Sequence, residues 1–316
     1  MMKVPTCNPT ADHHIDLCAH EESASSEPSQ ALNLPKPARE RLNELDLTED
    51  GLLMPLEKIE IGAKIGGGTF GSVHKGMLFG TDVAIKIVTI REGDVKREAM
   101  KEVKKLRYPN IVNLKGVCYE VSQLLLVTNY IDGSNLHQII FYNSCDLDTP
   151  KRINICIQIA KALAYMHGRD PVIIHQDIKP ANIMVTSSDL HVFVCDLGVA
   201  KLQSKLAIHK TSRGPGAGTV AYKAPEMFRD SRRSTPVDIY SFGCVIIELF
   251  TGKRVWGELD TCQITCKILG TREDDPQTPS CEEVPEKHRE ICARSTTLDG
   301  SDRPSAQEML EHFKLQ

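Results

Sequence analysis

The pattern of apolar residues changes character near Gly133, and this change constrains the fold of the 316-residue chain more than any other feature. Before Gly133, apolar residues alternate with polar ones, as in "KIEIGAKIG" (58–66), or form β-branched runs such as "TDVAIKIVTI" (81–90). After it, residues 150–167 and 236–250 have the apolar spacing of an amphipathic and a buried helix. Strands first and helices afterwards predict an α+β fold, with two unlike lobes and a cleft between them.

Three further segments refine this prediction. The charged segment 92–108 places Val95, Ala99, Val103 and Leu106 on one face of a helix, which would be the one helix of the β-rich lobe. Two more β-like runs follow it and end at "QLLLVTNYI". The last helix is predicted to open in "SDRPSAQEML" (301–310), with Pro304 in its first turn.

Composition excludes several classes of protein. The formal net charge of −4 gives no reason to expect nucleic acid or an anionic membrane as a partner. No apolar run approaches the roughly 20 residues of a membrane span, and "CVIIELF" (244–250) is a core segment. The eleven cysteines have no disulfide-scaffold spacing and predict reduced thiols in an intracellular, cytoplasmic protein.

Residues 1–57 differ from the rest of the chain. They contain "SASSEPSQ" and little apolar periodicity, so we expect a disordered or loosely structured tail. Cys7, His13, His14, Cys18 and His20 could bind zinc, but their spacing fits no compact zinc module, which favours the tail.

A glycine-rich turn and a lysine point to an anionic ligand. "GGGTFGSV" (66–73) fits G-x-G-x-x-G-x-V between two predicted strands, where backbone amides can approach phosphate oxygens. No helix follows the glycines, which argues against a dinucleotide fold. Lys86 lies in the next strand among apolar residues, so an anion held by the glycine turn would be its natural partner.

Further motifs follow in a fixed order along the chain. They are His175-Gln176-Asp177 with Asn182, then Asp196-Leu197-Gly198, then Ala224-Pro225-Glu226, and finally Asp238 and Arg303. With the glycine turn and Lys86, this set resembles the eukaryotic protein kinase domain over about residues 58–316. The resemblance implies an N-lobe over about 58–128, a hinge over about 129–133 and a C-lobe over about 134–316. His175, Asp238 and the Glu226–Arg303 pair would be structural.

The resemblance also implies the chemistry. Asp177 would be the base that accepts the proton of the attacking hydroxyl, with Lys179 as a further catalytic residue. Lys86 would hold the α- and β-phosphates. Asn182 and Asp196 would bind Mg²⁺, with Mn²⁺ as an alternative ion. The residues implied to bind ATP are Ile65, Gly66, Gly67, Gly68, Gly71, Val73, Ala84, Lys86, Thr128, Asn129, Ile131 and Met184.

Two features of the sequence indicate which type of hydroxyl is phosphorylated. Lys179 in "DIKPAN" and Thr219 in "GTVAYKAPE" resemble kinases that modify serine and threonine, and Thr219 would contact Asp177 and Lys179 at the substrate platform. "RPSAQEML" and "YPNIV" resemble the tyrosine kinase-like group of these enzymes. The partners implied are proteins bearing serine or threonine.

Two positions depart from the family pattern. The glutamate expected to pair with Lys86 falls on Ala99. Glu98 is favoured as its replacement, and the alternatives are Glu102 or a weak pair. Gln176 stands where most members have an arginine that pairs with a phosphorylated activation segment. We therefore expect activity with little dependence on that phosphorylation. These departures also leave open a pseudokinase that binds nucleotide and acts as a scaffold or allosteric partner.

Overall fold

The computed structural model describes residues 53–68, 71–89, 105–120, 123–142, 147–197, 220–229, 234–270 and 277–315. All statements about structure below concern these residues.

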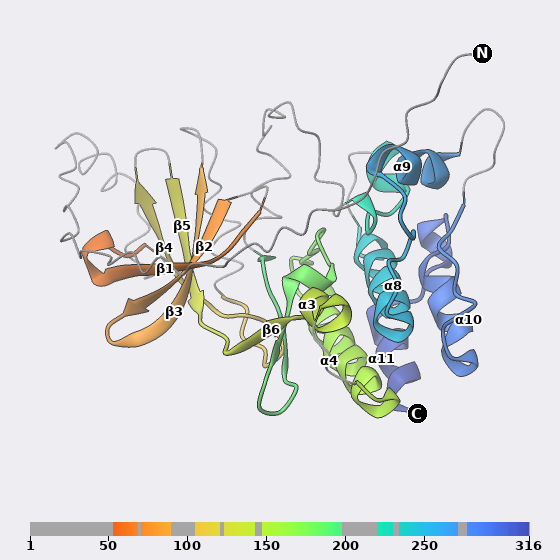
Figure 1. Ribbon diagram of the computed structural model, residues 1–316, viewed down its shortest axis with the longest axis horizontal. Helices are drawn as coiled ribbons and strands as arrows, with labels where there is room; N and C mark the ends of the chain where they lie inside the picture. Colours follow the sequence, from red (N-terminus) through yellow and green to blue (C-terminus); the bar gives the residue numbers. More distant parts are fainter. Residues whose placement is uncertain are drawn as a thin grey trace, which may run out of the picture. The chain divides into compact units, whose positions relative to one another are not determined.

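The N-terminal part of the described chain forms an antiparallel sheet of five strands (Figure 1). Its strands are β1 (Ile59–Gly68), β2 (Gly71–Leu78), β3 (Thr81–Thr89), β4 (Leu114–Glu120) and β5 (Gln123–Asn129), in the order β1-β2-β3-β5-β4. β-branched residues favour strands because their side chains pack well on a pleated surface. Val83 and Ile85 of β3 are fully buried in this way, on one face of the sheet.

A second, smaller sheet follows the five-stranded one. It contains β6 (Gly133–Asn135), β7 (Ile183–Thr186) and β8 (Val192–Val194), which pair antiparallel in that order. A short 3-10 helix, η2 (Pro180–Asn182), leads directly into β7. The segment that holds the central sequence motif therefore ends in this sheet.

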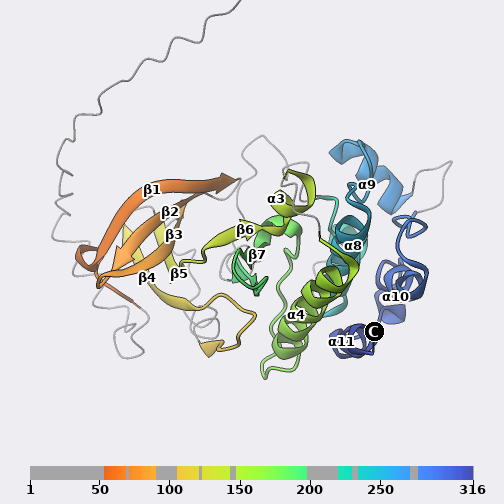
Figure 2. The same ribbon diagram turned by 60° about the horizontal axis from the view of Figure 1, so that its bottom comes forward.

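Helices dominate the remainder (Figure 2). They are α3 (Leu136–Phe141), α4 (Thr149–His167), α7 (Glu226–Arg229), α8 (Pro236–Thr251), α9 (Thr261–Leu269), α10 (Glu286–Ser295) and α11 (Ala306–Lys314), with 3-10 turns η1 (Leu56–Lys58) and η3 (Gly300–Asp302). Helix α8 packs against α4 and α10, and α11 packs against α4. Every residue of α8 from Val237 to Phe250 is buried, so α8 is the centre of the helical core.

Caps explain where several helices begin and end. Asp148, at the N-terminus of α4, accepts a hydrogen bond from the amide of Lys151. Helix α8 ends at Gly252, whose φ of 67° lies in the left-handed region that favours glycine. No helix among the described residues is long and apolar enough to cross a membrane.

The predicted α+β fold is confirmed, as are the predicted strands and the helices over 150–167 and 236–250. The core segment 244–250 is buried throughout. The prediction for Pro304 is wrong: α11 begins at Ala306 and Ser305 is its N-cap, so Pro304 precedes the helix. Ser305 takes the capping position because its hydroxyl accepts from the amide of Glu308.

The helix predicted over 92–108 is too long at its C-terminal end. Lys105 is helical, but residues 106–108 are not, and Leu106 is buried outside any helix. The remainder of that segment, up to residue 104, and the predicted tail up to residue 52 lie outside the described residues.

Candidate active site

One face of the five-stranded sheet presents a lysine to a cavity. Cross-strand pairing sets Val73 opposite Lys86, and Ala84 opposite Thr128. Directly opposed residues point to the same face of a sheet, so these four side chains lie together. Val83 and Ile85 point to the other face and are fully buried in a separate core cluster. The alternation along β3 therefore directs Lys86 into the cavity.

The turn between β1 and β2 depends on glycine at position 71. Gly71 has a φ of 137°, and a Cβ atom there would collide with the carbonyl oxygen of Ile87. The chain can adopt this conformation at little cost only without a side chain. Gly71 pairs with Gly68 across the two strands, so backbone without side chains faces backbone at this point.

The segment after α4 is anchored by a buried aspartate. Asp238 of α8 is fully buried and accepts hydrogen bonds from the amides of His175 and Gln176, at 2.8 and 2.7 Å. It also lies 2.9 Å from Nε2 of His167. Gln176 has a φ of 68°, a conformation that turns the chain sharply towards Asp177. Charge-assisted bonds from α8 therefore fix the backbone directly before Asp177.

His175 reinforces the same segment from the other side. Its Nε2 lies 2.7 Å from the carbonyl oxygen of Cys195, and its Nδ1 lies 3.2 Å from the amide nitrogen of Asp177. This pattern assigns the proton to Nε2, because Nδ1 must accept from the Asp177 amide. The buried imidazole thus links the residue after β8 to the Asp177 loop through two hydrogen bonds.

Two polar side chains converge on Asp177. The ammonium of Lys179 lies 2.7 and 3.0 Å from the two carboxylate oxygens. The amide nitrogen of Asn182 donates to the backbone and carboxylate oxygens of Asp177, both at 2.8 Å. Because both of these partners are acceptors, the side-chain oxygen of Asn182 points away from Asp177.

Asp196 and Lys86 form an ion pair across the cavity. One carboxylate oxygen of Asp196 lies 2.6 Å from Nζ of Lys86. Asp196 has a φ of 68°, and the neighbouring amide of Cys195 donates to the carbonyl oxygen of Asn182 at 2.8 Å. Asp196 is thereby held beside Asn182, although fourteen residues separate them in the sequence.

Oxygen ligands at this point fit a magnesium ion. Asp196 offers a carboxylate and Asn182 an amide oxygen directed away from Asp177. Mg²⁺ is typically bound by one or two such oxygens together with phosphates and water. No group of three or more histidine, cysteine or acidic side chains among the described residues could hold a metal, so a transition-metal cage is not offered here.

A cavity of about 1070 Å³ unites these groups. Most of the site residues expected from the sequence line it, and they come from both sheets and from the loop between α4 and β7. They are Ile65, Gly66, Gly67, Gly71, Val73, Ala84, Lys86, Thr128, Asn129, Ile131, Asp177, Lys179, Asn182, Met184 and Asp196.

The structure does not test three of the expected residues. Gly68 is the last residue of β1, at the edge of a described range. Glu98 and Thr219 lie outside the described residues, and so does Glu102, the alternative partner of Lys86.

The cavity also extends into a region that none of the sequence motifs predicts. On the far side of Asp177 the cavity is lined by Ala221, Trp256 and Ile264. Ala221 precedes α7, Trp256 precedes α9, and Ile264 belongs to α9. Trp256, the one tryptophan of the chain, was the available signal. Cys195 also lines the cavity, and burial, followed by the charge of Asp196, raises the pKa of its thiol to about 12. Cys195 is therefore a protonated thiol at neutral pH.

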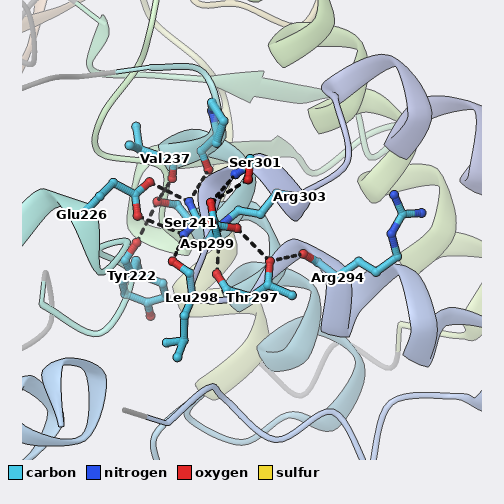
Figure 3. A network of polar contacts seen from close by, with 11 residues as sticks. Tyr222, Glu226, Val237, Ser241, Arg294, Thr297, Leu298, Asp299, Ser301 and Arg303 are labelled. Atoms are coloured by element: carbon cyan, nitrogen blue, oxygen red, sulfur yellow. Dashed lines mark hydrogen bonds and ion pairs between the residues drawn. The ribbon is translucent and has the colours of Figure 1, made fainter. Parts of the chain in front are cut away.

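Away from the cavity, Arg303 ties the end of the chain to the segment after residue 220 (Figure 3). Its guanidinium binds both carboxylate oxygens of Glu226, at 2.7 and 2.9 Å. It also donates to three backbone carbonyls, those of Pro236, Thr297 and Leu298. The predicted ion pair is thus present, and its arginine side chain is fully buried.

Comparison with known proteins gives a consistent result. The family model described as "Protein kinase domain" matches residues 59–313. The serine/threonine-protein kinase CTR1 of Arabidopsis thaliana is 34% identical over 249 residues, which cover 76% of this chain and 30% of that protein. The probable serine/threonine-protein kinase drkD of Dictyostelium discoideum is 33% identical over 262 residues, 81% of this chain and 20% of that protein. The chain thus spans less than a third of either relative.

Proposed function

Because the chain belongs to the protein kinase domain family, we propose that it is an ATP-dependent protein kinase that phosphorylates serine and threonine hydroxyls of proteins. One observation carries the proposal. Asp177, Lys179 and Asn182 form a hydrogen-bonded group that shares a cavity with the Lys86–Asp196 ion pair. A base, metal-binding oxygens and phosphate-binding cations are thus all present within one cavity.

The roles follow from charge and geometry. The carboxylate of Asp177 orients the attacking hydroxyl and accepts its proton. Lys179 lies beside that carboxylate and can neutralise charge on the transferred phosphoryl group. Lys86 faces the glycine turn from the neighbouring strand, where it can bind the phosphates of ATP.

ATP and Mg²⁺ belong to this proposal. The apolar part of the cavity, between Val73, Ala84 and Met184, suits a purine ring. The oxygens of Asp196 and Asn182 would hold the metal ion, which neutralises phosphate charge when bound, and Mn²⁺ has the same ligand preferences here.

Serine/threonine specificity rests on Lys179, on the expected contact of Thr219 and on the similarity to two serine/threonine-protein kinases. The similarity to CTR1 supports the proposed place in the tyrosine kinase-like group. Among the described residues, no observation favours the pseudokinase alternative.

The proposal extends to organisation and location. We place the kinase domain at 58–316 and a separate N-terminal segment at 1–57. The last residues of that segment are ordered against the domain, because the amide of Met54 donates to the carbonyl oxygen of Val117. A cytoplasmic location is supported by the described cysteines, all of which are free thiols.

Transfer of labelled γ-phosphate from ATP to a mixture of unstructured proteins tests the proposal. The expected products are phosphoserine and phosphothreonine, formed with Mg²⁺ or Mn²⁺ and abolished by a chelator. The absence of transfer with both ions would refute the enzyme, and phosphotyrosine as the main product would refute the specificity.

Regulation can be tested on the same assay. Gln176 has no charge to pair with a phosphorylated side chain. Alanine at Ser204, Thr211 and Ser212, which lie outside the described residues, is therefore expected to leave the rate within about threefold of wild type. Loss of activity that phosphomimetic residues restore would contradict this prediction.

A further inference from the structure

The cavity that contains Asp177 has two parts. The first part carries the glycine turn, Lys86 and the residues that we assign to the purine ring. The second part is lined by residues of α3, of the segment before α7 and of the stretch 254–264, which leads into α9. Because the proposed function assigns the first part to ATP, the second part is the place for the protein that carries the hydroxyl.

This second part carries an arginine whose position is fixed. Arg254 follows the end of α8, is exposed and lines the cavity. Its guanidinium lies over the ring of Phe141 of α3, 5.0 Å from the ring centroid. A guanidinium that stacks on an aromatic ring keeps the N–H donors at its edge available for a ligand. The stacking therefore presents the cation at the cavity wall.

None of the neighbouring acidic groups neutralises this cation. Within the described ranges, Arg254 forms no ion pair or hydrogen bond through its side chain. Glu248 is 1% exposed and already accepts bonds from a tyrosine hydroxyl and a backbone amide, so it does not face a ligand. Glu258 is exposed at the same wall but is not paired with Arg254. The guanidinium is thus able to bind an anionic group.

A histidine beside Arg254 shows the sign of the local charge. His137 of α3 also lines the cavity. Burial, followed by the charge of Arg254, lowers the pKa of His137 below its usual value of 6.5. The imidazole is therefore mainly neutral at pH 7, and it leaves Arg254 as the cation at this wall.

The residue before Arg254 provides an internal comparison. Lys253 is also an exposed cation after α8, but its ammonium lies 2.8 and 2.7 Å from the two carboxylate oxygens of Glu283. Lys253 does not line the cavity. One of two adjacent cations is therefore matched by an acidic residue away from the cavity, whereas the other is unmatched at its wall.

We propose that Arg254 binds an acidic side chain of the protein substrate, so that the enzyme prefers serine and threonine with aspartate or glutamate nearby in the sequence. This inference rests on the proposed function, because it concerns the substrate of the same site. A planar guanidinium binds a carboxylate through two parallel hydrogen bonds. The cavity has a volume of about 1070 Å³, and an extended chain advances about 3.3 Å per residue. The acidic residue should therefore lie within about four residues of the hydroxyl.

Phosphorylation of a set of synthetic peptides by the full chain tests this inference. Each peptide has a central serine, and aspartate, glutamate, alanine or lysine is placed at one flanking position at a time. We expect aspartate and glutamate to exceed lysine in kcat/KM by about 3–5-fold at one or two positions. Because the contact is exposed to water, the preference should weaken at high salt concentration.

Variants assign the preference to one side chain. Arg254→Ala should remove it, Arg254→Glu should reverse it in favour of lysine, and Arg254→Lys should retain part of it. The matched control Lys253→Ala should keep the wild-type preference. A purely structural role of Arg254 would change rates without changing which charge is preferred.

The outcomes separate this inference from the proposed function. Phosphorylation of serine with no acidic preference in the wild-type protein, or with a preference that survives Arg254→Glu, would overturn the role of Arg254 and leave the kinase activity established. No transfer to any peptide would overturn the kinase activity and this inference with it. A preference that reverses with the charge at position 254 and is unchanged in Lys253→Ala supports the inference.

Discussion

Two ion pairs of the molecule differ in burial and in role. The Glu226–Arg303 pair is bidentate, its arginine side chain is fully buried, and three backbone carbonyls satisfy the remaining donors (Figure 3). The Lys86–Asp196 pair has a single contact of 2.6 Å, and its side chains are 15% and 31% exposed to a cavity. The first pair has no reason to separate, whereas the second can exchange its partners for phosphate and metal. Substitutions in the first pair should therefore lower stability, and substitutions in the second should lower the rate of phosphate transfer.

The largest effect should come from the cavity pair. Asp196→Asn removes the charge that holds the metal ion, and we expect the rate of phosphate transfer to fall by about 10²–10³-fold. The melting temperature should fall less than on loss of the Glu226–Arg303 pair, because both side chains of the Lys86–Asp196 pair are partly exposed in the cavity. Kinetics and thermal melting of the same preparation check both expectations.

A substitution in the helical pair should show the opposite pattern. Arg303→Met leaves Glu226 and three carbonyls without their donor, and we expect unfolding to be easier by about 3–5 kcal/mol. Denaturant titration measures this loss. The double variant Glu226→Gln/Arg303→Met should recover part of it, because the uncompensated carboxylate is then absent. If Arg303→Met instead lowered activity at unchanged stability, the division between the two pairs would be wrong.

A third carboxylate has no cation at hydrogen-bond distance and refines the comparison. Glu248 is 1% exposed and accepts from the hydroxyl of Tyr222 at 2.8 Å and the amide of Val255 at 3.1 Å. Burial raises its pKa. Tyr222→Phe removes one of these donors, so we expect a loss of about 1–3 kcal/mol in unfolding free energy. A loss below the error of the titration would show that water replaces the hydroxyl.

The smallest effect should be a dependence of stability on pH at α10. His288 is buried against Phe250 and Phe313, and burial, followed by the charge of His312, lowers its pKa from 6.5 to about 4. Between these values the unfolded chain binds the proton and the folded chain does not, so stability is lost as the pH falls from about 6.5 to about 4.

Thermal melting at pH 7.5 and pH 5.0 measures this dependence. The variant His288→Phe should reduce the fall in melting temperature over that range, because the ring remains and the titrating group is absent. An unchanged fall in the variant would assign the pH dependence to other groups.

Local patterns predict the parts of this molecule that depend on near neighbours. Alternation predicts β1 and β3, and the spacing of Asp177, Lys179 and Asn182 places all three on one loop and a 3-10 turn. The face of β3 that carries Lys86 follows from the same alternation, since Val83 and Ile85 occupy the other face.

Local patterns do not predict the contacts between segments that lie far apart in the sequence. Asp238 holds amides more than 60 residues away, and Lys86 meets Asp196 across 110 residues. The motif order suggests that these residues belong to one site, but only the packing of α8 and of both sheets shows which atoms meet. The extension of the cavity to Trp256 has no signal in the sequence beyond the presence of a single tryptophan. The start of α11 was also predicted inaccurately, because Ser305, the residue after Pro304, is the N-cap.

The most direct test of this account compares two aspartates that lie twelve residues apart. Asp177 faces the cavity, whereas Asp189 caps the turn between β7 and β8 through Thr186 and does not line the cavity. We predict that Asp177→Asn lowers phosphate transfer by about 10²–10⁴-fold at an unchanged melting temperature, while Asp189→Asn leaves the rate near wild type. An Asp177→Asn protein that is folded and retains more than about a tenth of the wild-type rate would contradict Asp177 as the base.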